Sequence, residues 1–205
     1  YWLQLLITRE DAPTALSDQT GSTLEHAAIG QIQIGSGLTV TREPTYPTNV
    51  TFLDNIYLVG YDLYCSADGN TLSVALHWEA TSSVSKDYTV FVHLLSPDGG
   101  LVTQHDASPV LPTGQWATGT RVIDMHTLAL TPGQLLSDSK IQLGLYHWPD
   151  MERVPVVQSG CAEAEDASVL LGTTYEDGSE SSGDLICPGV RWKEGLDNCD
   201  PVQNP

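Results

Sequence analysis

Short runs in which apolar and polar side chains alternate, or in which β-branched and aromatic residues cluster, recur along this chain. Runs of about four to eight residues, separated by Gly, Pro, Asp and Ser, are typical of β-strands joined by turns. No useful stretch has the period of an amphipathic helix. The pattern predicts strands over 52–64, 71–80, 88–95, 101–105, 121–130, 141–148, 154–157 and 168–175, with further strand-like runs at 1–8 and 28–35.

The clearest local structure is a β-hairpin around the sequence Ser96-Pro97-Asp98-Gly99. The run before it, residues 90–95, has the composition of a central strand. Pro97 presets φ for the first corner of a type I turn, and Gly99 can take the left-handed position that closes a three-residue loop. The chain then returns as the strand predicted over 101–105.

The strand pattern predicts an all-β fold, an Ig-like or jelly-roll-type antiparallel β-sandwich over residues 50–175. Pro44 and Pro47 mark residues 36–49 as a linker. Residues 176–205 are predicted to be an irregular polar tail that carries two cysteines.

Residues 1–35 are predicted to form an extra N-terminal β-hairpin. A strand, a polar loop and a short glycine-bearing strand follow one another there, and the same order recurs within 141–173. One interpretation is that residues 1–35 are the end of a preceding, similar domain; the other is that any two hairpins look alike at this level. The chain begins inside a strand-like run, so we interpret it as a processed product or a part of something longer.

The charge is strongly acidic, with 26 acidic residues against 8 basic ones and a formal net charge of −18 over 205 residues. Such a surface repels nucleic acid and anionic lipid, which makes both poor partners. No run approaches the length of about 18 apolar residues that a membrane span needs, so no membrane insertion is expected.

Four cysteines, an even number, stand at Cys65, Cys161, Cys187 and Cys199. Their spacing contains no C-x-x-C, which argues against a zinc finger or an attached haem. We therefore expect an oxidising, extracytoplasmic compartment and two disulfides. Of the three possible pairings we favour Cys187 with Cys199 and Cys65 with Cys161.

Several stretches together resemble a known module. They are DNIYLVGYDL at 54–63, LHWEA at 76–80, DYTVFVHLLSPDG at 87–99, QHD at 104–106, WATGTRVID at 116–124 and LGLY at 143–146. As a set they resemble the soluble β-sandwich domain at the C-terminal end of bacterial multi-span membrane glycosyltransferases. The resemblance covers roughly residues 50–175 and implies an extracytoplasmic, non-catalytic appendage, because the catalytic part of such proteins is their membrane portion. The cysteine-bearing tail departs from the pattern.

The residues themselves give little indication of catalysis. No G-x-S-x-G nucleophile turn occurs, and the acids that could pair in a glycosidase stand near predicted strand ends, where solvated carboxylates are ordinary. We therefore predict that the chain is not an enzyme and needs no cofactor.

His93 and His105 are candidate ligand-binding residues on the two strands of the hairpin. A three-residue loop would pair Phe91 with His105 and place both histidines diagonally on one face. A two-residue loop would put them on opposite faces. A metal would need a third ligand that the pattern does not supply, so no metal site is predicted.

Tyr146 and Trp148 are the best candidates for exposed aromatic side chains on which a sugar could stack. On the strand predicted over 141–148, both side chains point to the face opposite the apolar residues Ile141, Leu143 and Leu145. Asn49 opens the sequence Asn49-Val50-Thr51, a candidate site for N-glycosylation.

Both faces of residues 90–95 are apolar, whereas a two-layer sandwich buries one face of each sheet. We expect the second face to be covered by the N-terminal hairpin, the tail or a partner chain, or else to be partly exposed.

The sequence thus favours a non-catalytic, extracytoplasmic interaction module that binds a glycan or the cell envelope, from a bacterial surface or membrane glycosyltransferase-type protein. The alternative is a structural subunit of an extracellular filament or surface assembly, docked through its N-terminal hairpin or its apolar sheet face. The expected partners are other protein domains or like subunits, with glycan as a further candidate.

Overall fold

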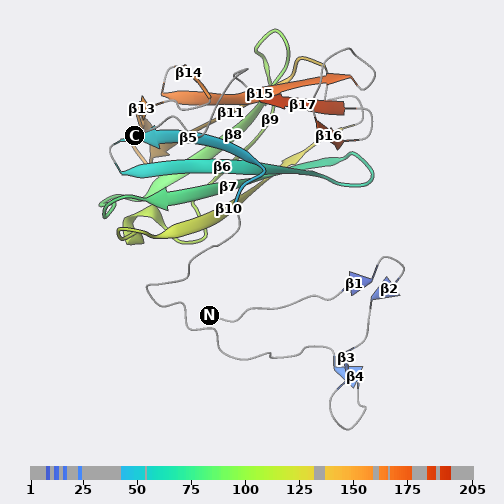
Figure 1. Cartoon of the computed structure of the whole chain (residues 1–205), viewed down its shortest axis with the longest axis horizontal. Helices are drawn as coiled ribbons and strands as arrows, with labels where there is room; N and C mark the ends of the chain where they lie inside the picture. Colours follow the sequence, from blue (N-terminus) through green and yellow to red (C-terminus); the bar gives the residue numbers. More distant parts are fainter. Residues whose placement is uncertain are drawn as a thin grey trace. The chain divides into compact units, whose positions relative to one another are not determined.

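The computed structural model describes residues 8–9, 12–13, 16–17, 23–24, 43–53, 55–131, 137–158, 162–165, 167–176, 184–187 and 190–194. The chain divides into two compact units, Tyr1–Leu38 and Thr39–Pro205. Almost every regular element is a strand, and the second unit consists of two antiparallel sheets that pack together (Figure 1). The all-β sandwich predicted from the alternation is confirmed.

One layer is a five-stranded antiparallel sheet in the order β10-β7-β6-β5-β13. Its strands are β5 (Tyr46–Phe52), β6 (Ile56–Cys65), β7 (Thr71–Ala80), β10 (Arg121–Ala129) and β13 (Val156–Gln158).

The other layer is an eight-stranded sheet with the path β16-β17-β15-β11-β8-β9, in which β12 also pairs with β11 and β14 with β15. Its strands are β8 (Tyr88–Leu95), β9 (Leu101–Ala107), β11 (Lys140–His147), β12 (Glu152–Arg153), β14 (Glu163–Glu165), β15 (Ser168–Glu176), β16 (Asp184–Cys187) and β17 (Val190–Glu194). A short 3-10 turn, η1 (Thr113–Gln115), carries the chain from β9 to β10.

Local sequence predicts several elements closely. β7 and β8 begin and end at the residues expected. In the loop between β8 and β9, Gly99 has φ +84° and its N–H donates to Ser96 O at 2.8 Å. The predicted hairpin and the role of Gly99 are confirmed, because both depend on neighbours in the sequence.

Most other boundaries differ by one or two residues, and two differences are larger. The strand expected over 52–64 is two strands, since Phe52 ends β5 and Ile56 begins β6 after a turn. The linker expected over 36–49 contains the start of β5 at Tyr46, paired with Tyr61. Pro47 lies within β5 and does not interrupt the sheet, because proline is tolerated where its missing N–H is not needed for the hydrogen bonds between strands.

The segment 176–205 is not simply an irregular tail. It supplies β16 and β17, which extend the eight-stranded sheet beside β15. Trp192 on β17 is buried in the core, where its Nε1 donates to the Tyr61 hydroxyl at 2.9 Å. That hydroxyl donates in turn to Leu171 O at 3.1 Å. This short chain of hydrogen bonds ties β17, β6 and β15 together and satisfies their buried polar atoms.

The core lies between the two sheets and is filled by inward-facing side chains of both. β10 alternates buried and more exposed residues from Arg121 to Ala129. Trp78 and Trp116 pack in the middle with ring centroids 6.4 Å apart. Trp116 Nε1 donates to Leu111 O at 2.8 Å, which fixes the loop before η1.

The N-terminal unit contains four two-residue strands within the described positions. β1 (Thr8–Arg9) pairs with β2 (Ala12–Pro13), and β3 (Leu16–Ser17) pairs with β4 (Thr23–Leu24). The strands expected over 1–8 and 28–35 fall outside the described residues, apart from Thr8.

Candidate binding surface

The outer face of the eight-stranded sheet is organised around Phe91 on β8. Phe91 is 1 % exposed although it points away from the core. Its register partner on β11 is Gly144, and a Cβ at that position would lie 2.6 Å from two carbons of the Phe91 ring. Glycine at 144 therefore leaves room for the Phe91 ring to pack directly against the backbone of β11.

Arg153 closes this face. Its guanidinium carbon lies 4.3 Å from the centroid of the Phe91 ring, a cation–π contact. The rings of His93 and Tyr146 flank Phe91, with centroids at 4.8 Å and 6.4 Å. Phe91 is thus covered by side chains of its own sheet. From the sequence we expected the N-terminal hairpin, the tail or a partner chain to cover this face, or the face to be partly exposed.

Asp106 on β9 joins the two candidates of this face. Its carboxylate lies 3.5 Å from His93 Nε2 and accepts from the Tyr146 hydroxyl at 3.4 Å. Burial lowers the pKa of His93, and nearby Arg153 adds to this effect, while Asp106 acts in the opposite direction. Burial and then the Asp106 charge raise the pKa of Tyr146.

The turn between β11 and β12 carries the most exposed tryptophan of the described residues. Trp148 is 66 % exposed, and Met151 in the same turn is 53 % exposed. Asp150 holds the turn, since its carboxylate lies 2.8 Å from His147 Nδ1 and accepts the Glu152 N–H at 3.1 Å. The bond with His147 is the main reason that the pKa of Asp150 lies below its usual value. The exposed indole therefore stands on a turn that two hydrogen bonds of Asp150 hold together.

His105 does not share a face with His93. A bulge between Leu94 and Leu95 shifts the register, so that His93 pairs with Gln104 and His105 pairs with Val92. His105 therefore faces the space between the sheets, and the expectation that both histidines lie on one face is wrong. A bulge adds one residue to one strand, and this reverses every later side chain.

His105 instead meets a polar pair on β10. Its Nδ1 lies 3.0 Å from His126 Nδ1, and His126 Nε2 lies 2.9 Å from Asp124 Oδ2. His126 is 0 % exposed. Sequence reasoning did not select His126, although its inward position in the alternation of β10 indicated a buried polar residue.

A second buried pair lies on the outer face of the five-stranded sheet. Asp62 on β6 is 1 % exposed and its Oδ2 lies 2.8 Å from His77 Nε2. Its other oxygen accepts from the backbone N–H of Thr45 at 2.9 Å and from the Thr45 hydroxyl at 2.6 Å. Residues 43–46 thus cover the pair, and the sequence missed it because that segment read as a linker.

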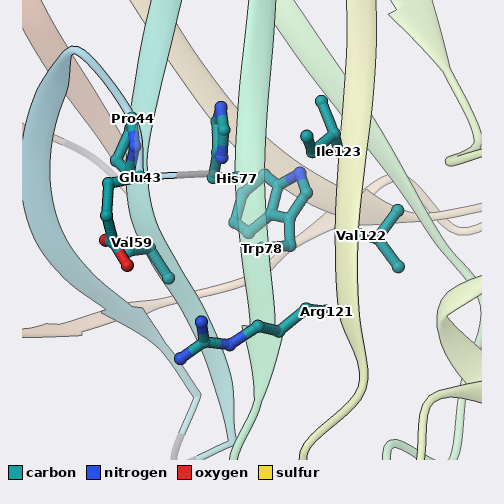
Figure 2. A pocket seen from close by; sticks show the side chains of 8 residues that line it. All are labelled: Glu43, Pro44, Val59, His77, Trp78, Arg121, Val122 and Ile123. Carbon is teal, nitrogen blue, oxygen red and sulfur yellow. The ribbon is translucent and has the colours of Figure 1, made fainter. Parts of the chain in front are cut away.

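The same face holds a small pocket (Figure 2). Figure 2 shows Arg121 extending toward Val59. Glu43 and Pro44 lie on one side of His77, and Ile123 lies on the other. The pocket offers only about 20 Å³ to solvent, room for one or two water molecules. A small-molecule site usually needs at least about 300 Å³, so this pocket is too small for one.

Two other predicted sites stay predictions. Asn49 lies in a bulge of β5 at φ +57°, and its side-chain oxygen accepts a hydrogen bond from the Tyr57 hydroxyl. Cys65 ends β6 and is not a free thiol. The side chains of Cys161, Cys187 and Cys199 lie outside the described residues, so neither disulfide pairing is tested.

Within the described residues, no three His, Cys, Asp or Glu side chains are arranged to hold a metal ion. In the same part of the chain, no helix has the length and hydropathy that crossing a membrane requires.

The chain matches no protein-family model and no curated protein sequence.

Proposed function

We propose that this chain is a non-catalytic interaction module whose sandwich binds an uncharged glycan through the surface formed by Tyr146 and Trp148. The observation that carries the proposal is the 66 % exposure of Trp148 on a turn fixed by Asp150. A large apolar ring on a hydrogen-bonded turn, with few rotatable bonds of its own, loses little conformational freedom when a ligand covers it.

The surroundings of the two aromatic rings supply hydrogen-bonding groups. Asp106 accepts from the Tyr146 hydroxyl, and Asp150, in the same turn as Trp148, directs its carboxylate to His147. Carboxylates accept strong hydrogen bonds from hydroxyl groups. Aromatic faces with a few polar groups around them are a common form of ligand site.

The charge of the chain favours an uncharged ligand. The formal net charge is −18, and the acidic residues Asp106, Asp150 and Glu152 outnumber the one arginine, Arg153, on the strands and turn that carry the proposed surface. Polysaccharides that carry carboxylates, sulfates or phosphates would be repelled. Neutral hexose chains carry no charge and would not be repelled.

Two observations support a role in binding over one in catalysis. The Asp124–His126 pair has the chemistry of a general base, but His126 is 0 % exposed and a substrate could not reach it. Asp62 and His77 are buried beneath residues 43–46.

We place the module outside the cytoplasm, stapled by disulfides, as an appendage of a bacterial surface protein or membrane glycosyltransferase. The four cysteines and the resemblance of residues 50–175 support this placement. The parent protein would supply the membrane portion and any catalytic activity.

The alternative is a structural subunit of an extracellular assembly, which needs a docking surface. One of the two surfaces expected for it, the outer apolar face of β8, is closed by Arg153 over Phe91. Size-exclusion chromatography with light scattering separates the two functions, since the module should be monomeric and the subunit should form a stable oligomer or polymer.

Affinity electrophoresis tests the glycan proposal. Gels that contain soluble neutral polysaccharides should retard the wild-type protein, and gels that contain a polyuronate should not. Trp148→Ala should weaken retardation by about tenfold or more, as expected for an aromatic hot spot. Met125→Ala is the matched control, because Met125 is also apolar and 50 % exposed but lies on β10. Equal retardation of Trp148→Ala and wild type, or none by a broad set of neutral glycans, would refute the proposal.

A further inference from the structure

Near β16 the two sheets are joined by an aromatic and polar contact. Tyr46 Oη donates to Asp184 Oδ2 at 2.9 Å, and Trp192 Nε1 donates to the Tyr61 hydroxyl at 2.9 Å. Tyr46 pairs with Tyr61 across β5 and β6, and Asp184 pairs with Trp192 across β16 and β17. These four residues fix one level at which β6 and β16 lie opposite each other.

From this level β6 and β16 run toward the same end of the sandwich. Val154 N–H donates to Leu145 O near the end of β11, and the following strand β13 pairs with the end of β5, where β6 begins. β6 and β15 both run away from there, since β15 is antiparallel to β11. β17 is antiparallel to β15 and β16 is antiparallel to β17, so β16 runs the same way. β6 and β16 consequently finish at one end of the sandwich (Figure 1), and their last residues are Cys65 and Cys187.

Both cysteine positions belong to the face of their sheet that is turned to the core. Cys65 is partly buried and packs against the core. Cys187 pairs with Val190, which packs against the core as well, and paired residues of neighbouring strands share a face. A register shift between Leu185 and Cys187 is responsible. Unbroken alternation from Asp184 would give Cys187 the outer face.

β16 approaches β6 more closely than two packed layers usually allow. Cα atoms of the two strands lie within 8 Å of each other, whereas the layers of a sandwich are about 10 Å apart. A disulfide joins Cα atoms about 4.4 to 6.8 Å apart. β5 does not separate β16 from the last residues of β6, because β5 begins only at Tyr46, opposite Tyr61. The sandwich therefore narrows on this side toward the spacing that a disulfide needs.

We propose that Cys65 and Cys187 form a disulfide that bonds the β16–β17 hairpin to the five-stranded sheet. Cys65 is not a free thiol, and the other cysteines of the chain are Cys161, Cys187 and Cys199. This pairing replaces the one that we favoured from the sequence, because the register of β16 brings Cys187 to the end of β6. The bond keeps Trp192 in the core and does not depend on whether the module binds glycan.

The described neighbours of Cys161 make it the poorer partner for Cys65. Ala162 leads into β14, whose first residue pairs with Leu170 of β15. The end of β15 that lies on the side of Cys65 is Glu176. Leu170 and Glu176 are six residues apart on one strand, a distance of about 20 Å. The chain next to Cys161 thus joins β15 well away from Cys65.

The bond forms by an ordinary exchange of thiols and disulfides. The two thiols give up two protons and two electrons to the disulfide of a thiol–disulfide oxidoreductase, which becomes a dithiol, by way of a mixed disulfide. Oxidants of this class belong to extracytoplasmic compartments, where we place the module.

Peptide mapping of the full chain without reduction tests the pairing. Free thiols are alkylated in denaturant before digestion. Trypsin alone leaves Cys161 and Cys187 in one peptide, since no Lys or Arg lies between Arg153 and Arg191, so a second protease that cleaves after Glu is needed. Mass spectrometry should find the peptide of Cys65 linked to the peptide of Cys187. A link from Cys65 to Cys161 or Cys199, or an alkylated Cys65, would overturn the proposal.

Thermal unfolding of three variants gives a second test. Cys65→Ser, Cys187→Ser and the double variant should each lower Tm by the same amount, about 10 °C or more, because each removes one and the same bond that closes a long loop. Losses that add up in the double variant would contradict a shared bond. Cys199→Ser is the control, and its peptide map should still show Cys65 linked to Cys187.

Discussion

Each outer face of the sandwich buries a group that would otherwise be exposed to water, and the two faces do so in different ways. On the five-stranded sheet, residues 43–46 cover a polar pair, Asp62 and His77. On the eight-stranded sheet, Arg153 covers an aromatic ring, Phe91. A glycine leaves room for close packing on each face: Gly60 lies under Pro44, which belongs to the covering segment, and Gly144 lies under Phe91, the ring that is covered.

The difference shows what each kind of cover must provide. A buried carboxylate has to be hydrogen-bonded on every side, and Asp62 accepts from Thr45 and His77. A buried ring needs only contact area, which one flexible side chain can give. The first face is therefore closed by a segment of chain, residues 43–46, through both backbone and side-chain groups. The second is closed by side chains alone, and Trp148 in the neighbouring turn stays exposed.

The largest expected effect comes from breaking the polar pair. Asp62→Ala leaves His77 and the Thr45 donors without their acceptor, and should lower the free energy of unfolding by about 3 to 5 kcal/mol. Asp106→Ala makes the same change beside His93 on the other face, where the carboxylate is partly exposed, and should cost about 1 kcal/mol or less. Urea denaturation of both variants measures this difference. Equal losses would mean that the two faces do not differ as described.

The two glycines give a smaller and matched comparison. In Gly60→Ala the new Cβ would clash with the backbone oxygen of Tyr46 and lie 2.6 Å from Pro44 Cγ. In Gly144→Ala it would lie 2.6 Å from the Phe91 ring and 3.0 Å from the backbone oxygen of Ala167, so its closest contact is with a side chain and not with backbone. We expect losses of about 3 kcal/mol and about 1 kcal/mol, within the range for overpacking. Thermal unfolding of the two variants measures both losses of stability. A larger loss in Gly144→Ala would contradict the view that the Phe91 ring adjusts more easily than residues 44–46.

Removal of the Arg153 charge tests how the Phe91 ring is covered. Arg153→Gln should cost about 0.5 to 1 kcal/mol through loss of the cation–π contact, whereas Arg153→Lys should retain part of it. Because Arg153 also lowers the pKa of His93, the pKa of His93 should rise in Arg153→Gln. Denaturation and an NMR titration of His93 check the two effects. An unchanged pKa would show that the guanidinium does not act on His93.

The smallest effect is the pH dependence due to His93. Burial lowers its folded-state pKa below the ordinary value of 6.5, so the unfolded chain takes up the proton first as the pH falls. The contribution of His93 to stability is therefore present above about pH 6.5 and is lost below it. His93→Gln should flatten this part of the curve of unfolding free energy against pH. A variant that loses as much stability as wild type below pH 6.5 would show that another group is responsible.

Much of the candidate surface could be predicted from sequence, but not its arrangement. Tyr146 and Trp148 were selected by alternation, and Trp148 is well exposed. His93 was selected as well, but its partners Phe91, Arg153 and Asp106 come from three strands. Arg153 belongs to β12, a two-residue strand that is too short for a periodic signal.

Alternation and turn chemistry by themselves determined that this protein is an all-β sandwich, and they located β7, β8 and the hairpin at Gly99. These features depend on residues that are neighbours in the chain. Only the tertiary structure decided that a bulge turns His105 toward His126, that residues 43–46 seal Asp62, and that Trp192 enters the core. Each of these depends on a contact between strands distant in sequence, and a local pattern carries no information about which distant strand will supply it.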